Sequence, residues 1–195
     1  MHRVTKFLVL GQLIFLAFAI VCFVLQPHAF LANAAFSYYG NYRLTIIPYA
    51  LGILSATACI IKAASFVKDS RDTIIRRALF GLAILLLGIL ASPYSVNGYF
   101  FAAHIVVSTL LLLVVLGVSS VIVFRRDRSA KSICLYISEI ITTTVLVLSQ
   151  GFIGVLHIHA LAELAIGLLF ISHLNLVFAE TSRAAIKDSN PLLDK

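Results

Sequence analysis

Charged residues are scarce in this sequence. They make up 12% of the 195 residues, whereas hydrophobic residues make up 61%, and the mean hydropathy is +1.05. A soluble domain has to cover itself with polar surface, and ordinary domains contain about 25% charged residues. The composition therefore excludes a soluble globular domain and is typical of a chain that lies in a membrane.

Cysteines are also few, and their positions do not favour bonding. Cys22 and Cys59 lie inside apolar runs, Cys134 begins a later run, and no two cysteines have the CxxC spacing of a zinc or redox motif. We therefore expect neither an external disulfide nor a cysteine-based metal site. The sequence predicts no bound metal and no cofactor.

Apolar runs long enough to cross a bilayer are abundant. A transmembrane helix needs about 20 consecutive residues, most of them apolar. Six such runs cover approximately residues 7–26, 44–62, 78–94, 100–124, 133–153 and 156–178. The predicted fold class is all-α, an integral membrane bundle of six transmembrane helices. One membrane domain over residues 1–186 and a short cytoplasmic tail over residues 187–195 account for the chain.

The basic residues lie almost entirely between these runs. Every Lys and Arg except Arg43 belongs to one of four clusters: Arg3 and Lys6; Lys62, Lys68, Arg71, Arg76 and Arg77; Arg125, Arg126, Arg128 and Lys131; Arg183, Lys187 and Lys195. Basic residues stay on the cytoplasmic side, so we expect both termini in the cytoplasm. We place the protein in a prokaryotic plasma membrane, with membrane lipids as partners. The net charge of +7 is then a signal of topology rather than of nucleic-acid binding.

The predicted outer end of the bundle is rich in tyrosine. The segment from Pro27 to Arg43 is the longest outer connection, and we expect it to cover this end. Tyrosines at or near the outer boundary are Tyr38, Tyr39, Tyr42, Tyr49, Tyr94 and Tyr99. An aromatic belt at the interface is the simpler interpretation, and a lipid-binding vestibule is the alternative. Arg43 could bind a phosphate there or extend to lipid headgroups. On the inner side, Asp69, Ser70 and Asp72 precede an apolar run and carry side chains that cap helix N-termini.

Ionisable side chains inside the apolar runs predict a site, because each costs at least about 2.5 kcal/mol at mid-membrane without a partner. His104, His159 and Glu163 all lie near the outer ends of their helices. His159 and Glu163 are four residues apart and share a helix face, and Tyr94 adds a hydroxyl at the same level. We interpret this outer cluster as a ligand-binding site; the alternative is that it only holds the helices together.

A second polar pair is predicted deeper in the membrane. Glu139 lies about 9 Å from the start of the fifth run, and His173 lies about 8 Å from the end of the sixth. The connection between these runs is short, so the two helices are antiparallel neighbours. We therefore expect Glu139 and His173 to meet, and we interpret the pair first as an interhelical contact.

Short motifs resemble a six-helix superfamily. The segments are Phe36-Ser37-Tyr38-Tyr39-Gly40, Gly88 to Pro93, His104, and Ala162-Glu163. This order is similar to the superfamily of the Frag, DRAM and Sfk-type proteins, including its prokaryotic branch of unknown function. That family often has Ser-Asp-x-Gly in the first outer loop and Glu-Trp in the last helix, where this chain has Tyr38 and Leu164. The resemblance implies that Ser37, Gly40, His104 and Glu163 correspond to family residues.

The function predicted from the sequence is binding of a lipid or other amphiphile in a cavity at the outer leaflet. The ligand-binding residues are then His104, His159, Glu163, Ser37, Tyr94 and Arg43. We do not assign the protein as an enzyme, and the sequence leaves its oligomeric state open. The first alternative is a proton-coupled transporter that uses the intramembrane Glu and His residues. The second is a haem-bearing electron carrier with His104 and His159 as axial ligands.

Overall fold

The structure, a computed structural model, describes residues 2–31, 35–68, 72–93, 98–151 and 159–189. Within these ranges every regular element is a helix, and six helices are long and apolar enough to cross a membrane. They are α1 (His2–Leu25), α3 (Ile46–Phe66), α4 (Thr73–Ala91), α5 (Gly98–Arg125), α6 (Ala130–Gly151) and α7 (His159–Ser189). The predicted all-α fold is confirmed, and the chain is a multi-pass membrane protein by helix length and composition.

Several helices are longer than the apolar runs that predict them. α3 continues past Lys62, α4 begins before Arg76, and α7 continues to Ser189. A cation near a helix end ends an apolar run without interrupting the backbone hydrogen bonds, because its long side chain can reach the interface. Residues 187–189 of the predicted tail are therefore helical, and residues 190–195 lie outside the described residues.

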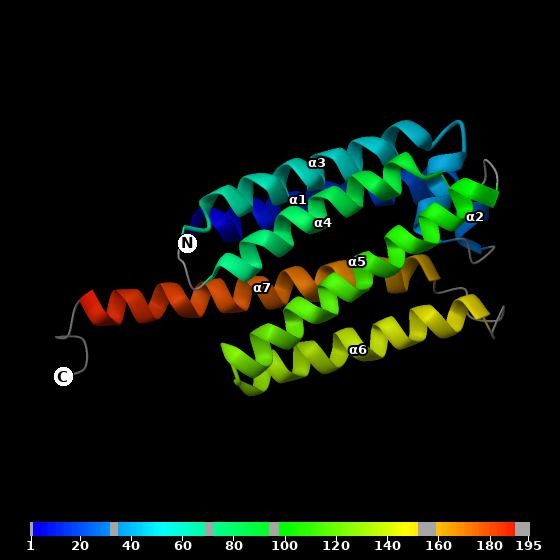
Figure 1. Cartoon of the computed structure of the whole chain (residues 1–195). Coiled ribbons are helices and arrows are strands. Elements are labelled where there is room, and N and C mark those ends of the chain that lie inside the picture. Colours follow the sequence, from blue (N-terminus) through cyan, green and yellow to red (C-terminus); the bar gives the residue numbers. More distant parts are fainter. Residues whose placement is uncertain (1, 32–34, 69–71, 94–97, 152–158, 190–195) are drawn as a thin grey trace.

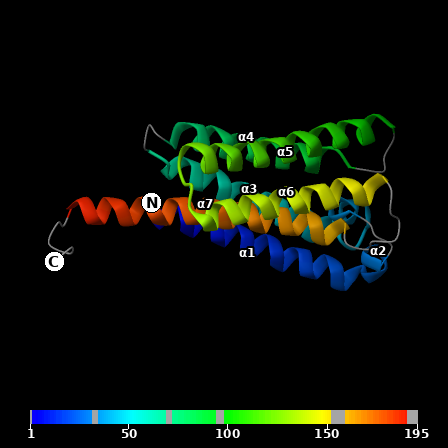
Figure 2. The same cartoon turned by 90° about the horizontal axis from the view of Figure 1, so that it is seen from below.

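The six long helices form a closed ring. Going round it, α1 packs on α3, α3 on α4, α4 on α5, α5 on α6, α6 on α7, and α7 on α1 (Figures 1 and 2). The predicted adjacency of the fifth with the sixth spanning helix is confirmed. Large apolar side chains such as Leu13, Ile84 and Leu113 remain exposed, as expected for helices that face lipid.

The bundle has two different ends. The start of α1, the end of α7 and the α5–α6 connection lie at one end, together with the basic clusters; we call it the basic end (Figure 1). The other end carries the short helices α2 (Pro27–Leu31) and η1 (Phe36–Asn41); we call it the loop end. The sequence predicts that the basic end faces the cytoplasm.

η1 is a short 3₁₀ helix that packs into the loop end of the bundle. Its residues Phe36 and Tyr39 are buried, and the Phe36 ring meets Phe15 edge-on with centroids 5.3 Å apart. The Thr45 hydroxyl donates a hydrogen bond to the Tyr39 carbonyl at 2.6 Å. Burial raises the pKa of the Tyr39 phenol to about 12, with smaller contributions from Cys22 and Tyr42. Through this ring packing and this hydrogen bond, η1 covers the loop end as an ordered element.

An ion pair joins helices at the basic end. Asp72 precedes α4, is 1% exposed, and accepts hydrogen bonds from both terminal nitrogens of Arg126, just after α5. The Arg126 guanidinium also lies 5.9 Å from the ring centroid of Phe178 on α7. Among the described contacts, the Asp72 side chain makes no capping hydrogen bond to α4. Asp72 therefore occupies the predicted N-cap position without capping through its side chain, because the carboxylate is used by this long-range partner. Asp69 and Ser70 lie outside the described residues.

Candidate ligand-binding cavity

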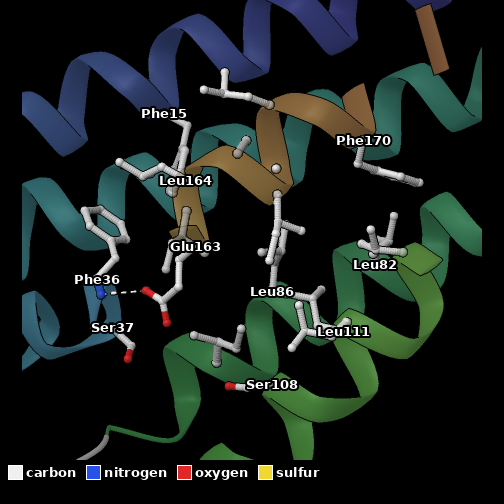
Figure 3. A pocket seen from close by; sticks show the side chains of 18 of the residues that line it. Phe15, Phe36, Ser37, Leu82, Leu86, Ser108, Leu111, Glu163, Leu164 and Phe170 are labelled. Carbon is white, nitrogen blue, oxygen red and sulfur yellow. Dashed lines mark hydrogen bonds between the residues drawn. The ribbon is translucent and has the colours of Figure 1, made fainter. Parts of the chain in front are cut away.

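A large cavity lies inside the ring of helices. Its volume is about 930 Å³, and all six spanning helices and η1 contribute to its wall. This volume is at the upper end of the range of about 300–1,000 Å³ that is usual for small-molecule sites. Most of the wall is apolar, with Phe15, Leu82, Leu86, Leu111 and Phe170 among the side chains in Figure 3. The cavity therefore suits a ligand that is mostly hydrocarbon.

Polar groups gather at one end of this cavity. The polar side chains of its wall are Gln12, Ser37, Tyr38, Tyr42, Tyr49, His104, Ser108 and Glu163. The Ser37, Tyr38 and Tyr42 side chains come from η1 or the residue after it, while Tyr49, His104 and Glu163 lie within about 9 Å of the ends of their helices at the loop end. Gln12 and Ser108 lie deeper. The cavity is thus amphipathic along its length.

Glu163 connects η1 to α7. Its Oε2 accepts a hydrogen bond from the backbone N–H of Phe36 at 2.5 Å, and Figure 3 shows the carboxylate between η1 and the open part of the cavity. Phe36 and Glu163 are 127 residues apart in sequence. A charge-assisted bond of this kind is stronger than one between neutral groups. Glu163 therefore both holds the covering segment in place and contributes a carboxylate to the wall.

His104 belongs to the same polar end. It is 5% exposed, so it does not turn its imidazole into the lipid. Its Nδ1 lies 2.8 Å from the carbonyl oxygen of Ser92. A carbonyl can only accept, so Nδ1 carries the proton and donates this hydrogen bond. The bond joins the end of α4 to the first turns of α5 and fixes the orientation of the ring beside the cavity.

The structure brings together only part of the predicted ligand-binding set. His104, Glu163 and Ser37 line one cavity, and the buried Ser37 Oγ has no hydrogen-bond partner within the described chain. Arg43 is exposed and is not part of the wall. Tyr94 and the side chain of His159 lie outside the described residues. Their predicted roles stay predictions.

Tyr49 also lines the cavity, although its position in the sequence did not predict it as a site residue. It is 4% exposed and lines the cavity, whereas the pattern of outer tyrosines favoured an interfacial belt. Its distance from the start of α3 matches the distance of Glu163 from the start of α7. That match in depth is the signal that could have grouped the two residues.

Glu139 and His173 lie in contact, as their matched depth predicts. His173 Nδ1 is 3.1 Å from Glu139 Oε1, and the other ring nitrogen, Nε2, is 2.7 Å from the hydroxyl of Ser132. All three residues are 0% exposed. None of them belongs to the wall of the cavity. The series Ser132–His173–Glu139 is therefore a sealed polar contact between α6 and α7, and nothing in the described structure gives a substrate access to the hydroxyl.

Comparison of the chain with protein-family models, with functionally characterised proteins and with solved structures finds no match. Membership of the Frag, DRAM and Sfk-type superfamily stays a prediction from short motifs. In the described part of the chain, no group of three or more His, Cys, Asp or Glu residues could hold a metal ion. The site is therefore assessed on its own geometry and chemistry.

Proposed function

We propose that this protein binds a lipid or other amphiphile in the cavity inside its ring of helices. The observation that carries the proposal is the distribution of polarity along the wall. Apolar side chains line the length of a cavity of about 930 Å³, whereas the carboxylate, the imidazole and all the described wall hydroxyls except that of Ser108 gather at the loop end. An amphiphile has the same distribution, with a hydrocarbon chain and one polar end.

The balance of energies explains why the polar end matters. Lipid tails are as apolar as leucine side chains, so moving a hydrocarbon chain from the bilayer into the cavity gains little from the hydrophobic effect. Polar groups in hydrocarbon, in contrast, cost several kcal/mol each without partners. A bound amphiphile forms hydrogen bonds between its polar end and the polar groups of the wall, so both sides gain partners. Selectivity then comes from the loop end, and the apolar wall accommodates the chain.

The predicted topology assigns the polar end to a leaflet. If the basic end faces the cytoplasm, the loop end lies at the outer face of the membrane. The proposed ligand then has its polar group at the level of the outer headgroups and its chain directed toward the bilayer centre. This orientation is the one that a lipid already has in the outer leaflet, so entry requires no inversion.

A cavity-filling variant tests the proposal. Gly167 lines the cavity, and a Cβ built on it meets no other atom within 4 Å. We expect Gly167→Phe to fold normally and to lose bound amphiphile, because its ring occupies the space of the chain. The measurement is native mass spectrometry of the purified protein, before delipidation and after readdition of membrane lipid extract.

Gly117 provides the matched control. A Cβ at Gly117 also meets no atom within 4 Å, but Gly117 is not part of the cavity wall. Gly117→Phe should therefore retain amphiphile at the level of the unaltered protein. Equal binding by the Gly167→Phe and unaltered proteins would show that this cavity is not the binding site.

A further inference from the structure

The charges around the cavity restrict the kind of polar group that it can accept. Among the described wall residues Glu163 is the only carboxylate, and no Lys or Arg is present. The sequence has no Lys or Arg from residue 7 to 61, 78 to 124 or 132 to 182, apart from Arg43. Arg43 is exposed and lies outside the wall. Among the described residues, the polar end of the cavity therefore has one carboxylate and no Lys or Arg.

Anionic headgroups do not fit this arrangement. Proteins recognise phosphate and carboxylate groups mainly with Arg and Lys, whose charge and donors match such anions. A phosphate or carboxylate at the polar end would instead lie beside the carboxylate of Glu163. Like charges repel strongly where the effective dielectric constant is low, as it is in an apolar cavity. An anionic amphiphile would thus add a second negative charge at an end whose described wall has no Lys or Arg.

A protonated amine fits the same groups well. An ammonium group has three N–H donors and no acceptor, so it needs neighbours that accept hydrogen bonds. The wall provides the Glu163 carboxylate, which opens toward the cavity (Figure 3). It also provides the Ser37 hydroxyl oxygen, which has no partner within the described residues. An ammonium is attracted by this carboxylate, whereas a second anion is repelled by it. Charge and hydrogen-bonding capacity therefore point to the same class of ligand.

We infer that the cavity selects an amphiphile whose polar group is a protonated amine over anionic amphiphiles with the same chain. The inference rests on the proposed function, since it specifies the ligand class of the same cavity. In this arrangement the amine donates hydrogen bonds to Glu163 and Ser37 while the chain lies along the apolar wall. Ligands with an uncharged hydroxyl bind less tightly than amines, and anionic ligands bind least.

The test compares three ligands that differ only in the polar group: hexadecylamine, hexadecanol and hexadecanoate. Each is added to delipidated protein in detergent, and binding is measured by native mass spectrometry and by the rise in thermal stability. We expect hexadecylamine to bind at least about tenfold more tightly than hexadecanoate, since hydrogen bonds to charged groups are worth at least this much. Hexadecanol should lie between them. This comparison uses the unaltered protein and needs no variant.

Variants then locate the selectivity. Glu163→Gln keeps an oxygen that can accept the hydrogen bond from the Phe36 N–H, so the covering segment stays attached. It should reduce binding of hexadecylamine to the level of hexadecanol and leave hexadecanol nearly unchanged. Glu139→Gln is the control, because Glu139 is a second carboxylate within the described membrane-crossing parts of the helices but lies off the wall. It should leave the preference for the amine intact.

Different outcomes overturn different claims. Equal or tighter binding of hexadecanoate, or an amine preference that survives Glu163→Gln, overturns the inferred selectivity while amphiphile binding stands. Failure of all three ligands to bind overturns the proposed function and the inference with it. Hexadecanol distinguishes the two cases, because it tests the apolar cavity without any charge.

Discussion

In the described structure, two carboxylates lie within the membrane-crossing parts of the helices, and their surroundings differ. Glu139 is 0% exposed and is packed against His173 between α6 and α7. Glu163 lines the cavity and accepts a hydrogen bond from η1. A polar group sealed between helices can contribute to stability but cannot meet a ligand, whereas one on a cavity wall can do both. The proposed function therefore uses Glu163, and Glu139 has a structural role.

The structural role of Glu139 predicts coupled effects on stability. Glu139→Ala and His173→Ala should each destabilise the detergent-solubilised protein, because each leaves a buried polar partner unsatisfied. The double variant should cost less than the sum of the single ones, with a coupling of about 0.6 to 2 kcal/mol. Equilibrium unfolding of the four proteins measures the cycle. Strictly additive losses would show that the two side chains do not support each other.

The sequence predicts a contact between two residues correctly where their depth in the membrane is enough to identify them as neighbours. Glu139 and His173 lie at matching depth on helices joined by a short connection, and they are in contact. Ser132 also forms a hydrogen bond with His173. This bond was not predictable, because nothing in the sequence around a serine near a helix start identifies a distant buried partner. Asp72 is the N-cap residue of α4, but its side chain bonds to Arg126, which is 54 residues away, and local capping rules do not register such distant neighbours.

At the scale of elements, the long helices follow from composition, whereas η1 does not. The runs of apolar residues are continuous and satisfy the length of a bilayer crossing. η1 is a single short 3₁₀ element, and such elements depend on tertiary contacts more than on local propensity. Its contacts are the aromatic packing of Phe36 and the hydrogen bond from Phe36 to Glu163. The sequence predicts that a segment covers this end of the bundle, but it does not predict the 3₁₀ conformation of η1.

η1 also contains a buried hydroxyl whose removal should stabilise the fold. The Tyr39 hydroxyl has no hydrogen-bond partner among the described residues, and Tyr39 is 0% exposed. Burying an unpaired hydroxyl costs about 1–3 kcal/mol, so Tyr39→Phe should raise stability by about 1 kcal/mol. Tyr99→Phe serves as the control, because Tyr99 is 87% exposed. Thermal unfolding in detergent measures both, and a clear loss of stability in Tyr39→Phe would contradict the expectation.

The same residue predicts a dependence on pH. A tyrosine in the unfolded state ionises near pH 10, whereas burial raises the pKa of Tyr39 to about 12 in the folded state. Between these values the unfolded state has lost a proton that the folded state keeps, so stability falls as the pH rises from about 10 to 12. Below pH 10 this contribution is constant. The stability difference between Tyr39→Phe and the unaltered protein should therefore widen over that range.

At the scale of the whole molecule, the ring of helices separates a basic end from a polar cavity end. Every Lys and Arg except Arg43 lies in the clusters between or beyond the apolar runs, and the structure gathers the start of α1 and the end of α7 at one end (Figure 2). The six crossings were predictable from composition. The cavity was not, because it depends on how side chains from seven separate elements fill the ring.

The orientation of this ring in the membrane is the last prediction. In a background with Cys22, Cys59 and Cys134 replaced, single cysteines are placed at Leu44 and Ala130, which are both exposed and lie at the loop end and the basic end. Basic residues resist translocation, so Leu44→Cys should react with a membrane-impermeant thiol reagent in intact cells. Ala130→Cys should react only after permeabilisation. The reverse pattern would place the polar end of the cavity in the cytoplasmic leaflet. The ligand would then be drawn from that leaflet, while the preference for an amine, which depends on Glu163 and not on orientation, would be unchanged.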